Sequence, residues 1–221
     1  MTRLYFVRHG QSAANAGALT MEHATIPLTP LGLAQAEALA QHLQVEPSRV
    51  LTSPFTRARD TAQPFCDKTG RQVEIHALLH EFETIDPALL EGMTGEQRRP
   101  IADAYWTRAD PHERLGPRAE TFAEFEGRVA TFMDDLASLP DRSVMFGHGM
   151  WMGLMAWKLL GLSASDGQSM KAFRRFQLGL PISNGVVYVL DSAGPGRWTW
   201  TVDEKMLRLV AAVKLQPAQN L

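Results

Sequence analysis

The sequence contains a single cysteine, Cys66, among its 221 residues. One thiol excludes an internal disulfide and suits a reducing compartment. The residues around Cys66 are typical of a helix interior, which favours a buried, inert thiol over a nucleophile. The seven histidines show no spacing typical of a zinc site. Neither a disulfide scaffold nor a structural zinc protein is indicated.

An excess of charge of one sign is also missing. The chain has 22 basic and 24 acidic residues, a net charge of −2, so it offers no basic surface for nucleic acid or an anionic membrane. No apolar run approaches the roughly 18 residues of a membrane-spanning helix. The apolar run at residues 4–7 is also shorter than the roughly 7–15 residues of a signal peptide core. We expect a cytoplasmic protein without nucleic-acid or membrane partners, and the oligomeric state stays open.

The chain does contain strand and helix patterns that alternate. Short apolar runs predict strands at the ranges 4–7, 49–54, 72–77 and 143–146. Amphipathic patterns predict helices at 27–43, 56–70, 119–139 and 150–161. This alternation favours an α/β fold: a three-layer α/β/α sandwich with a mostly parallel central sheet and helices on both faces. A predicted hairpin, 185–191 with 197–203, adds an antiparallel edge.

The segment at about 79–118 departs from this alternation, because several prolines and glycines interrupt it. We interpret it as an insertion with one or two short helices that lies over the active site as a lid. No linker or internal repeat divides the rest, so we expect one domain over 1–221. The last residues, around Pro217, are expected to form a loose tail.

Two predicted strands end in a histidine followed by glycine. The first strand runs into Arg8, His9 and Gly10, and the strand at 143–146 is followed by His148 and Gly149. Ligands of open α/β sheets bind beyond the carboxyl ends of the strands, so the two histidines are expected to face one crevice. Glycine at each place would let the backbone approach a ligand closely.

Two arginines belong to the same predicted crevice. Arg57 falls in the first turn of a predicted helix, where a cation opposes the helix dipole and makes better sense beside an anion. Arg8 follows a buried strand without a local carboxylate. Two arginines, two histidines and helix N-termini at one sheet edge predict a pocket for a dianion, and phosphate is the common one.

Four segments together resemble the histidine phosphatase superfamily, which has the phosphoglycerate mutase-like fold. They are "RHG" with Asn15 five residues after the glycine, "PLTPLGLAQA", "TSPFTRARDTA" and "FGHG". The segments occur in family order between residues 4 and 149, each in the strand–turn–helix context that the chemistry requires.

The resemblance implies a role for each matching residue. His9 would be the nucleophile that forms a phosphohistidine, with its second ring nitrogen held by a backbone carbonyl. Arg8, Arg57 and His148 would bind the phosphoryl oxygens, and Asn15 would donate a further hydrogen bond. The family needs no metal or other cofactor for this chemistry, and the expected partner is a small phosphorylated substrate.

The proton donor is expected just after the third strand. Leu79, His80 and Glu81 match the family's Leu-x-Glu context, so the resemblance implies Glu81 as the general acid and base. Glu83 would face the same way in an extended segment, and it stays as the alternative. The sequence beyond it departs from the family pattern, which leaves the identity of the phosphate ester and the insertion's part in specificity undetermined.

These observations predict a metal-independent, broad-specificity phosphomonoesterase. One alternative is a phosphoglycerate mutase-type phosphoryl transferase. Such mutases usually have a longer basic insertion, whereas only 66 residues lie between Glu81 and His148 here. The second alternative is a non-catalytic module that binds a phosphorylated ligand or a partner protein. Such modules tend to lose the nucleophile or an arginine, and this sequence has kept both.

Overall fold

The sheet in the computed structural model, which describes residues 2–194 and 196–214, has the order β3-β2-β4-β1-β5-β6. Its strands are β1 (Arg3–Arg8), β2 (Val50–Thr52), β3 (Val73–Ile75), β4 (Val144–Gly147), β5 (Val187–Gly194) and β6 (Arg197–Val202). The first four strands are parallel, whereas β5 and β6 pair antiparallel at one edge. The predicted α/β fold, mostly parallel with an antiparallel edge, is confirmed.

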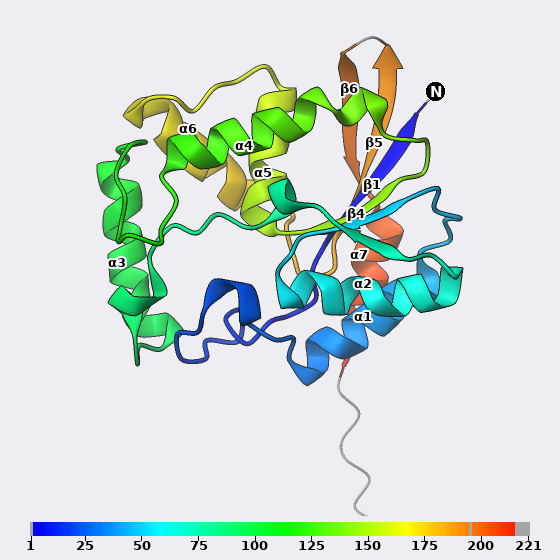
Figure 1. The fold of residues 1–221 in the computed structure, drawn as a ribbon, viewed down its shortest axis with the longest axis horizontal. Helices are drawn as coiled ribbons and strands as arrows, with labels where there is room; N and C mark the ends of the chain where they lie inside the picture. Colours follow the sequence, from blue (N-terminus) through cyan, green and yellow to red (C-terminus); the bar gives the residue numbers. More distant parts are fainter. Residues whose placement is uncertain (1, 195, 215–221) are drawn as a thin grey trace, which may run out of the picture.

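One face of the sheet is covered by α1 (Pro30–His42), α2 (Thr56–Thr69) and α7 (Glu204–Ala211), which lie below the strands in Figure 1. Leu39, Phe65 and Met206 from these helices are buried in one cluster with Val7 and Phe146 of the sheet. Burial of such side chains contributes about 1.5–3 kcal/mol each to the free energy of unfolding. This layer fixes the underside of β1 and β4.

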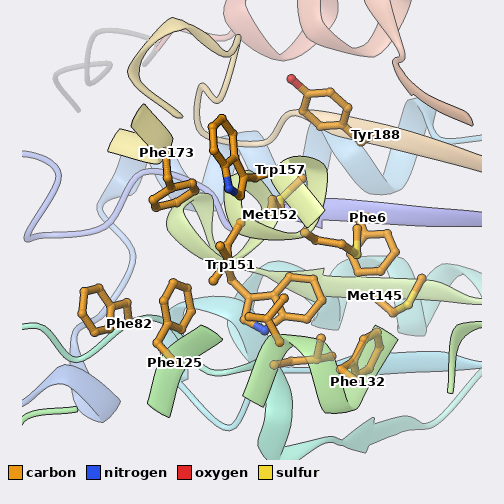
Figure 2. Close-up of a cluster of buried hydrophobic side chains, with 14 of the residues drawn as sticks. Phe6, Phe82, Phe125, Phe132, Met145, Trp151, Met152, Trp157, Phe173 and Tyr188 are labelled. Carbon is orange, nitrogen blue, oxygen red and sulfur yellow. The ribbon is translucent and has the colours of Figure 1, made fainter. Parts of the chain in front are cut away.

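The opposite face is covered by α4 (Phe122–Asp134), α5 (Gly149–Leu159) and α6 (Gly167–Gly179). Its core is largely aromatic (Figure 2): Phe6 of β1 stacks on Trp151 of α5 with ring centroids 5.6 Å apart, and Phe132 packs edge-on against Trp151. Because Phe6 and Val7 point to opposite faces, β1 is buried on both sides, which explains its continuous apolar run.

Two helix ends behave as the sequence predicts. Thr29 caps α1 by accepting a hydrogen bond from Gly32 N at 3.1 Å, with Pro30 as the first helical residue. At Gly70, φ is 67°, a left-handed conformation that ends α2. Gly32 has a further role, because a Cβ there would lie 2.0 Å from Gln11 O. Glycine thus allows α1 to lie directly against the segment that follows β1.

The segment at 79–118 contains η3 (Pro87–Leu90) and α3 (Gly95–Arg108), so its main helix is longer than we expected. A capping box between Thr94 and Gln97 starts α3 and compensates for Pro100 within the helix. In Figure 1 this helix stands apart from the sheet, and it contacts α6. Shorter 3₁₀ turns are η1 (His23–Thr25), η2 (Ala77–Leu79) and η4 (Leu136–Ser138).

Two helices have no counterpart among the sequence predictions. No element was expected in the stretches that form α6 and α7. The expectation for Pro217 lies outside the described residues. Among the described helices, none is both long and apolar enough to cross a membrane.

Candidate functional site

The sheet order brings three chain segments to one edge. β4 lies between β2 and β1, and all three are parallel, so Ser53, His148 and His9 leave their carboxyl ends side by side. Backbone hydrogen bonds fix this arrangement: His9 N donates to Gly147 O at 3.0 Å and Ser53 N to Phe146 O at 2.9 Å. The rings of His9 and His148 are buried with centroids 5.2 Å apart. The two histidines therefore meet over one crevice, as predicted.

The His9 ring is held in one tautomer. Its Nδ1 lies 2.6 Å from Gly10 O, and because a carbonyl oxygen only accepts, Nδ1 carries the proton. Nε2 keeps its lone pair and accepts a hydrogen bond from Arg57 Nε at 3.3 Å. Burial, with the charges of Arg57 and Arg8, holds the pKa of His9 well below its usual value. The ring is neutral near pH 7, and its free electron pair points at a cation.

Arg57 is buried, and Arg8 half-buried, beside this ring. Arg57 donates from Nη1 to His23 O at 2.7 Å, and its guanidinium lies 4.9 Å from the centroid of the Phe55 ring. Burial lowers its pKa to about 10, against the opposing charge of Glu81. Arg8 donates from Nη1 to Ile182 O, while its buried Nε has no partner among the described residues. The two positive charges are thus largely shielded from water, and Arg8 Nε remains available to donate a hydrogen bond to a ligand.

His148 is fixed by a hydroxyl. Its Nε2 lies 2.7 Å from Ser53 Oγ, which itself accepts a hydrogen bond from Phe55 N at 3.2 Å. The hydroxyl proton is therefore free to point at Nε2, which places the ring proton on Nδ1. That Nδ1 is buried and has no partner within the described part of the chain. Burial, helped by the charge of Arg57, holds the pKa of His148 well below its usual value.

The Glu81 carboxylate lies at the N-terminus of α5. Oε2 accepts from Met150 N at 3.0 Å, and Oε1 accepts from Trp151 N at 3.1 Å and Phe82 N at 3.0 Å. His148 is the N-cap residue of α5, so the Glu81 carboxylate and the His148 imidazole both lie at the N-terminus of this helix. The charge of Glu81 also acts on Arg8 and Arg57.

Glu83 is the more loosely held of the two carboxylates. Its Oε2 lies 3.9 Å from His80 Nε2, and its charge acts on Arg57 but contributes less than that of Glu81. Both carboxylates thus stay in reach of the arginines. Among the described residues, no group of three or more histidine, cysteine or acidic side chains is arranged to hold a metal.

Asn15 is joined to the site through a residue that the sequence did not reveal. Its Oδ1 accepts from Ser12 Oγ at 3.0 Å and from Asn184 Nδ2 at 2.9 Å. Asn184 Nδ2 also lies 3.1 Å from His9 O and 3.2 Å from Gly10 O. Since Gly10 O is the acceptor for the His9 ring, Asn184 braces the group that sets the tautomer. With its oxygen engaged, the amide nitrogen of Asn15 remains as a donor.

The two glycines after the histidines are used differently from our expectation. A Cβ at Gly10 would lie 2.5 Å from Gly32 O, so the missing side chain makes room for the backbone of α1. A Cβ at Gly149 would lie 3.0 Å from Arg8 Nε, so this glycine makes room for a guanidinium. In both places the close approach is made by the protein itself and not by an open ligand site.

The sequence comparisons agree with this geometry. Residues 4–194 match the profile of the histidine phosphatase superfamily, branch 1. The chain belongs to this superfamily. The match runs from β1 to the end of β5, and so includes every residue described above as part of the site.

Named relatives in the superfamily include both phosphatases and mutases. A probable phosphoglycerate mutase from Photorhabdus laumondii is 27% identical over 172 residues, 74% of this chain and 77% of that protein. An adenosylcobalamin/alpha-ribazole phosphatase from Salmonella typhi is 31% identical over 169 residues, 74% of this chain and 82% of that protein. The structure of a mycobacterial glucosyl-3-phosphoglycerate phosphatase with VO3 aligns with a TM-score of 0.70 and 25% identity, over 92% of this chain and 98% of that one.

Proposed function

We propose that this protein is a phosphatase that hydrolyses small phosphate monoesters through a phosphohistidine on His9, without a metal. The observation that carries the proposal is the neutral His9 ring, with its proton fixed on Nδ1 by Gly10 O and its Nε2 lone pair directed at Arg57. A histidine nucleophile needs one unprotonated, oriented nitrogen. The reducing environment suited to a lone thiol favours action in the cytoplasm.

The first step transfers the phosphoryl group to the protein. The phosphoryl oxygens lie among Arg8, Arg57 and His148. The unpartnered nitrogens of Arg8 and His148, and the positive charges of the two arginines, offset the charge that spreads over these oxygens in the transition state. His9 Nε2 forms a bond to phosphorus while the bond between phosphorus and the alcohol oxygen breaks. Glu81 acts as the general acid and gives a proton to that oxygen as the alcohol leaves.

The second step releases phosphate. Water attacks the phosphorus of the phosphohistidine, Glu81 takes up one water proton, and the bond from phosphorus to Nε2 breaks. The electron pair returns to Nε2, while the proton on Nδ1 stays hydrogen-bonded to Gly10 O throughout. Inorganic phosphate and the original protein result, and Glu81 is again protonated for the next cycle.

A mutase is the second candidate, because one relative is named as a probable phosphoglycerate mutase. Phosphatase is favoured, because the relative with the higher identity carries a phosphatase name and the insertion is short. A non-catalytic module is disfavoured, because the nucleophile and both arginines are retained and lie together.

The proposal is tested by phosphate release from a generic aryl phosphate. His9→Ala should reduce kcat by at least about 10³-fold, whereas His42→Ala, at an exposed position on α1, should leave it unchanged. Unchanged hydrolysis by His9→Ala would refute the nucleophile. With 3-phosphoglycerate and 2,3-bisphosphoglycerate, isomer formation without phosphate release would identify a mutase instead.

A further inference from the structure

A cavity of about 100 Å³ lies between the chain that follows β1 and the insertion. The first wall comes from the segment 14–26 and the second from η3 and α3. Hydrogen bonds join the walls, such as Thr20 N to Met93 O at 2.9 Å and Gly95 N to Gly17 O at 3.1 Å. The cavity is therefore a built part of the fold. The apolar side chains that line it are Leu19, Met21, Ile26, Pro87 and Leu90.

The cavity shares its walls with the phosphate site. His23 lines it with its side chain, while its backbone oxygen accepts the hydrogen bond from Arg57 Nη1 at 2.7 Å. Ala14 lines it too and directly precedes Asn15. An ester whose phosphoryl group contacts Arg57 therefore has this cavity as a neighbour for its alcohol portion.

The one cationic side chain in the cavity lining is already engaged. Arg98 Nη1 donates to Ala18 O at 3.0 Å, Thr20 Oγ1 at 3.1 Å and Met93 O at 2.8 Å. These bonds hold the guanidinium as part of the wall, next to Gly95. Apart from Arg98, Thr20 and His23, the lining is apolar, which suits an alkyl group better than a row of hydroxyls.

Two apolar side chains of this cavity are also exposed to solvent. Leu19 is 57% and Met21 41% exposed, although both line the cavity. Solvent-exposed apolar side chains beside a proposed active site are typical of a surface that a ligand covers. The cavity volume equals about three water-sized groups, which corresponds to a short alkyl chain or the edge of a ring.

We propose that this cavity binds the apolar alcohol portion of the substrate, so that the protein prefers alkyl or aryl phosphates over phosphorylated polyols. This inference rests on the proposed phosphatase function. It assigns specificity to the contact between the segment 14–26 and η3, the region where the sequence departs from the family pattern.

The test compares kcat/KM for methyl, propyl and n-butyl phosphate and for glycerol 1-phosphate. The leaving alkoxides of the three alkyl esters have similar basicity, so differences report binding. Each methylene that enters the cavity should raise kcat/KM by about fourfold. Propyl phosphate should exceed glycerol 1-phosphate, which has the same carbon chain with two hydroxyls, by about tenfold or more.

A pair of variants locates the effect. Met21→Gln should lower the ratio of kcat/KM for butyl over methyl phosphate by about fivefold, mainly through KM. Leu89→Gln is the matched control, because Leu89 is 55% exposed beside Leu90 but does not line the cavity, and it should keep the wild-type ratio. Equal kcat/KM for all esters, or an equal loss in both variants, would overturn the inference while phosphate release still supports the proposed function. Absence of release from every ester would overturn both.

Discussion

Arg57 Nε lies 3.3 Å from Nε2 of His9, so the proposed nucleophile and a cation face each other without a carboxylate between them. Burial of the ring, together with this contact, holds the pKa of His9 well below its usual value, because protonation would place a second positive charge beside Arg57 away from water. In the proposed mechanism, phosphorus bonds to this nitrogen and the phosphoryl oxygens contact the guanidinium.

Arg57→Lys should lower kcat for an aryl phosphate by about 10²-fold or more, although the charge is kept. A lysine ammonium lacks the several N–H donors of the planar guanidinium, so it cannot donate to His23 O and to the phosphoryl oxygens at the same time. Steady-state kinetics measure the loss, and the control is Arg59→Lys, two positions along the same helix and exposed. Equal activities of both variants would show that Arg57 has no special role.

Asn184→Ala should lower kcat by about tenfold to a hundredfold, since the turn at His9 and Gly10 loses its side-chain donor. Asn184→Asp should be no better, because carboxylate oxygens cannot donate to these carbonyls. Ser183→Ala at the exposed neighbouring position serves as control. Kinetics over pH test the idea: loss of stability alone, with kcat and its pH profile unchanged, would reduce Asn184 to a structural residue.

Glu81→Gln should affect esters according to their leaving group. Hydrolysis of an alkyl phosphate, whose alkoxide needs a proton, should fall by about 10²- to 10⁴-fold. Hydrolysis of a nitrophenyl phosphate, whose leaving group needs little help, should fall far less. Glu83→Gln is the matched comparison, and if it shows the leaving-group dependence while Glu81→Gln does not, Glu83 is the proton donor.

Most of the fold could be predicted because strands that are buried on both faces of the sheet appear in the sequence as continuous apolar runs. The apolar run before Arg8 and the cap at Thr29 each act over a few residues, so local patterns identify them. Trp198 and Trp200 alternate with threonines and face the core, as an edge strand requires. α7 was not predicted because it is only eight residues long, although its buried residues, Met206 and Val210, are four positions apart as on one helix face.

The site could be predicted in part for a similar reason. His9 and His148 interrupt apolar strands, which is visible locally, and the sheet order then brings them together. No local pattern identifies Asn184, because its hydrogen-bond partners lie far away in the sequence. Asn15, for example, is 169 residues earlier in the chain. Ser53 was likewise hidden, since a serine after a strand is ordinary until a histidine is seen 2.7 Å away.

Acid should destabilise the protein through His9 and His148. In the folded state the pKa values of both rings lie well below the ordinary histidine value of about 6.5, first because burial disfavours the charged ring. As pH falls below about 6.5, these two histidines become protonated in the unfolded chain but stay neutral in the folded chain. The free energy of unfolding therefore decreases. Each ring contributes a slope of up to about 1.4 kcal/mol per pH unit.

Urea denaturation between pH 7.5 and 5.5 measures this slope. His148→Asn should lower the free energy of unfolding overall but make it less dependent on pH than in the wild type. The variant lacks one of the two histidines whose pKa is lowered by folding. His42→Asn, which alters an exposed ring, should keep the wild-type slope. A slope that is the same in all three proteins would contradict the assignment of acid sensitivity to the site.

The covalent intermediate on His9 is the central claim, and rapid-quench trapping tests it most directly. Wild-type protein mixed with an excess of an aryl phosphate is quenched in alkali, where phosphohistidine survives, and digested for mass spectrometry. We predict a phosphoryl group on Nε2 of His9, formed no more slowly than turnover and absent from His9→Ala. Turnover by the wild type with no label on His9 at any time, or with the label on another residue, would contradict the account.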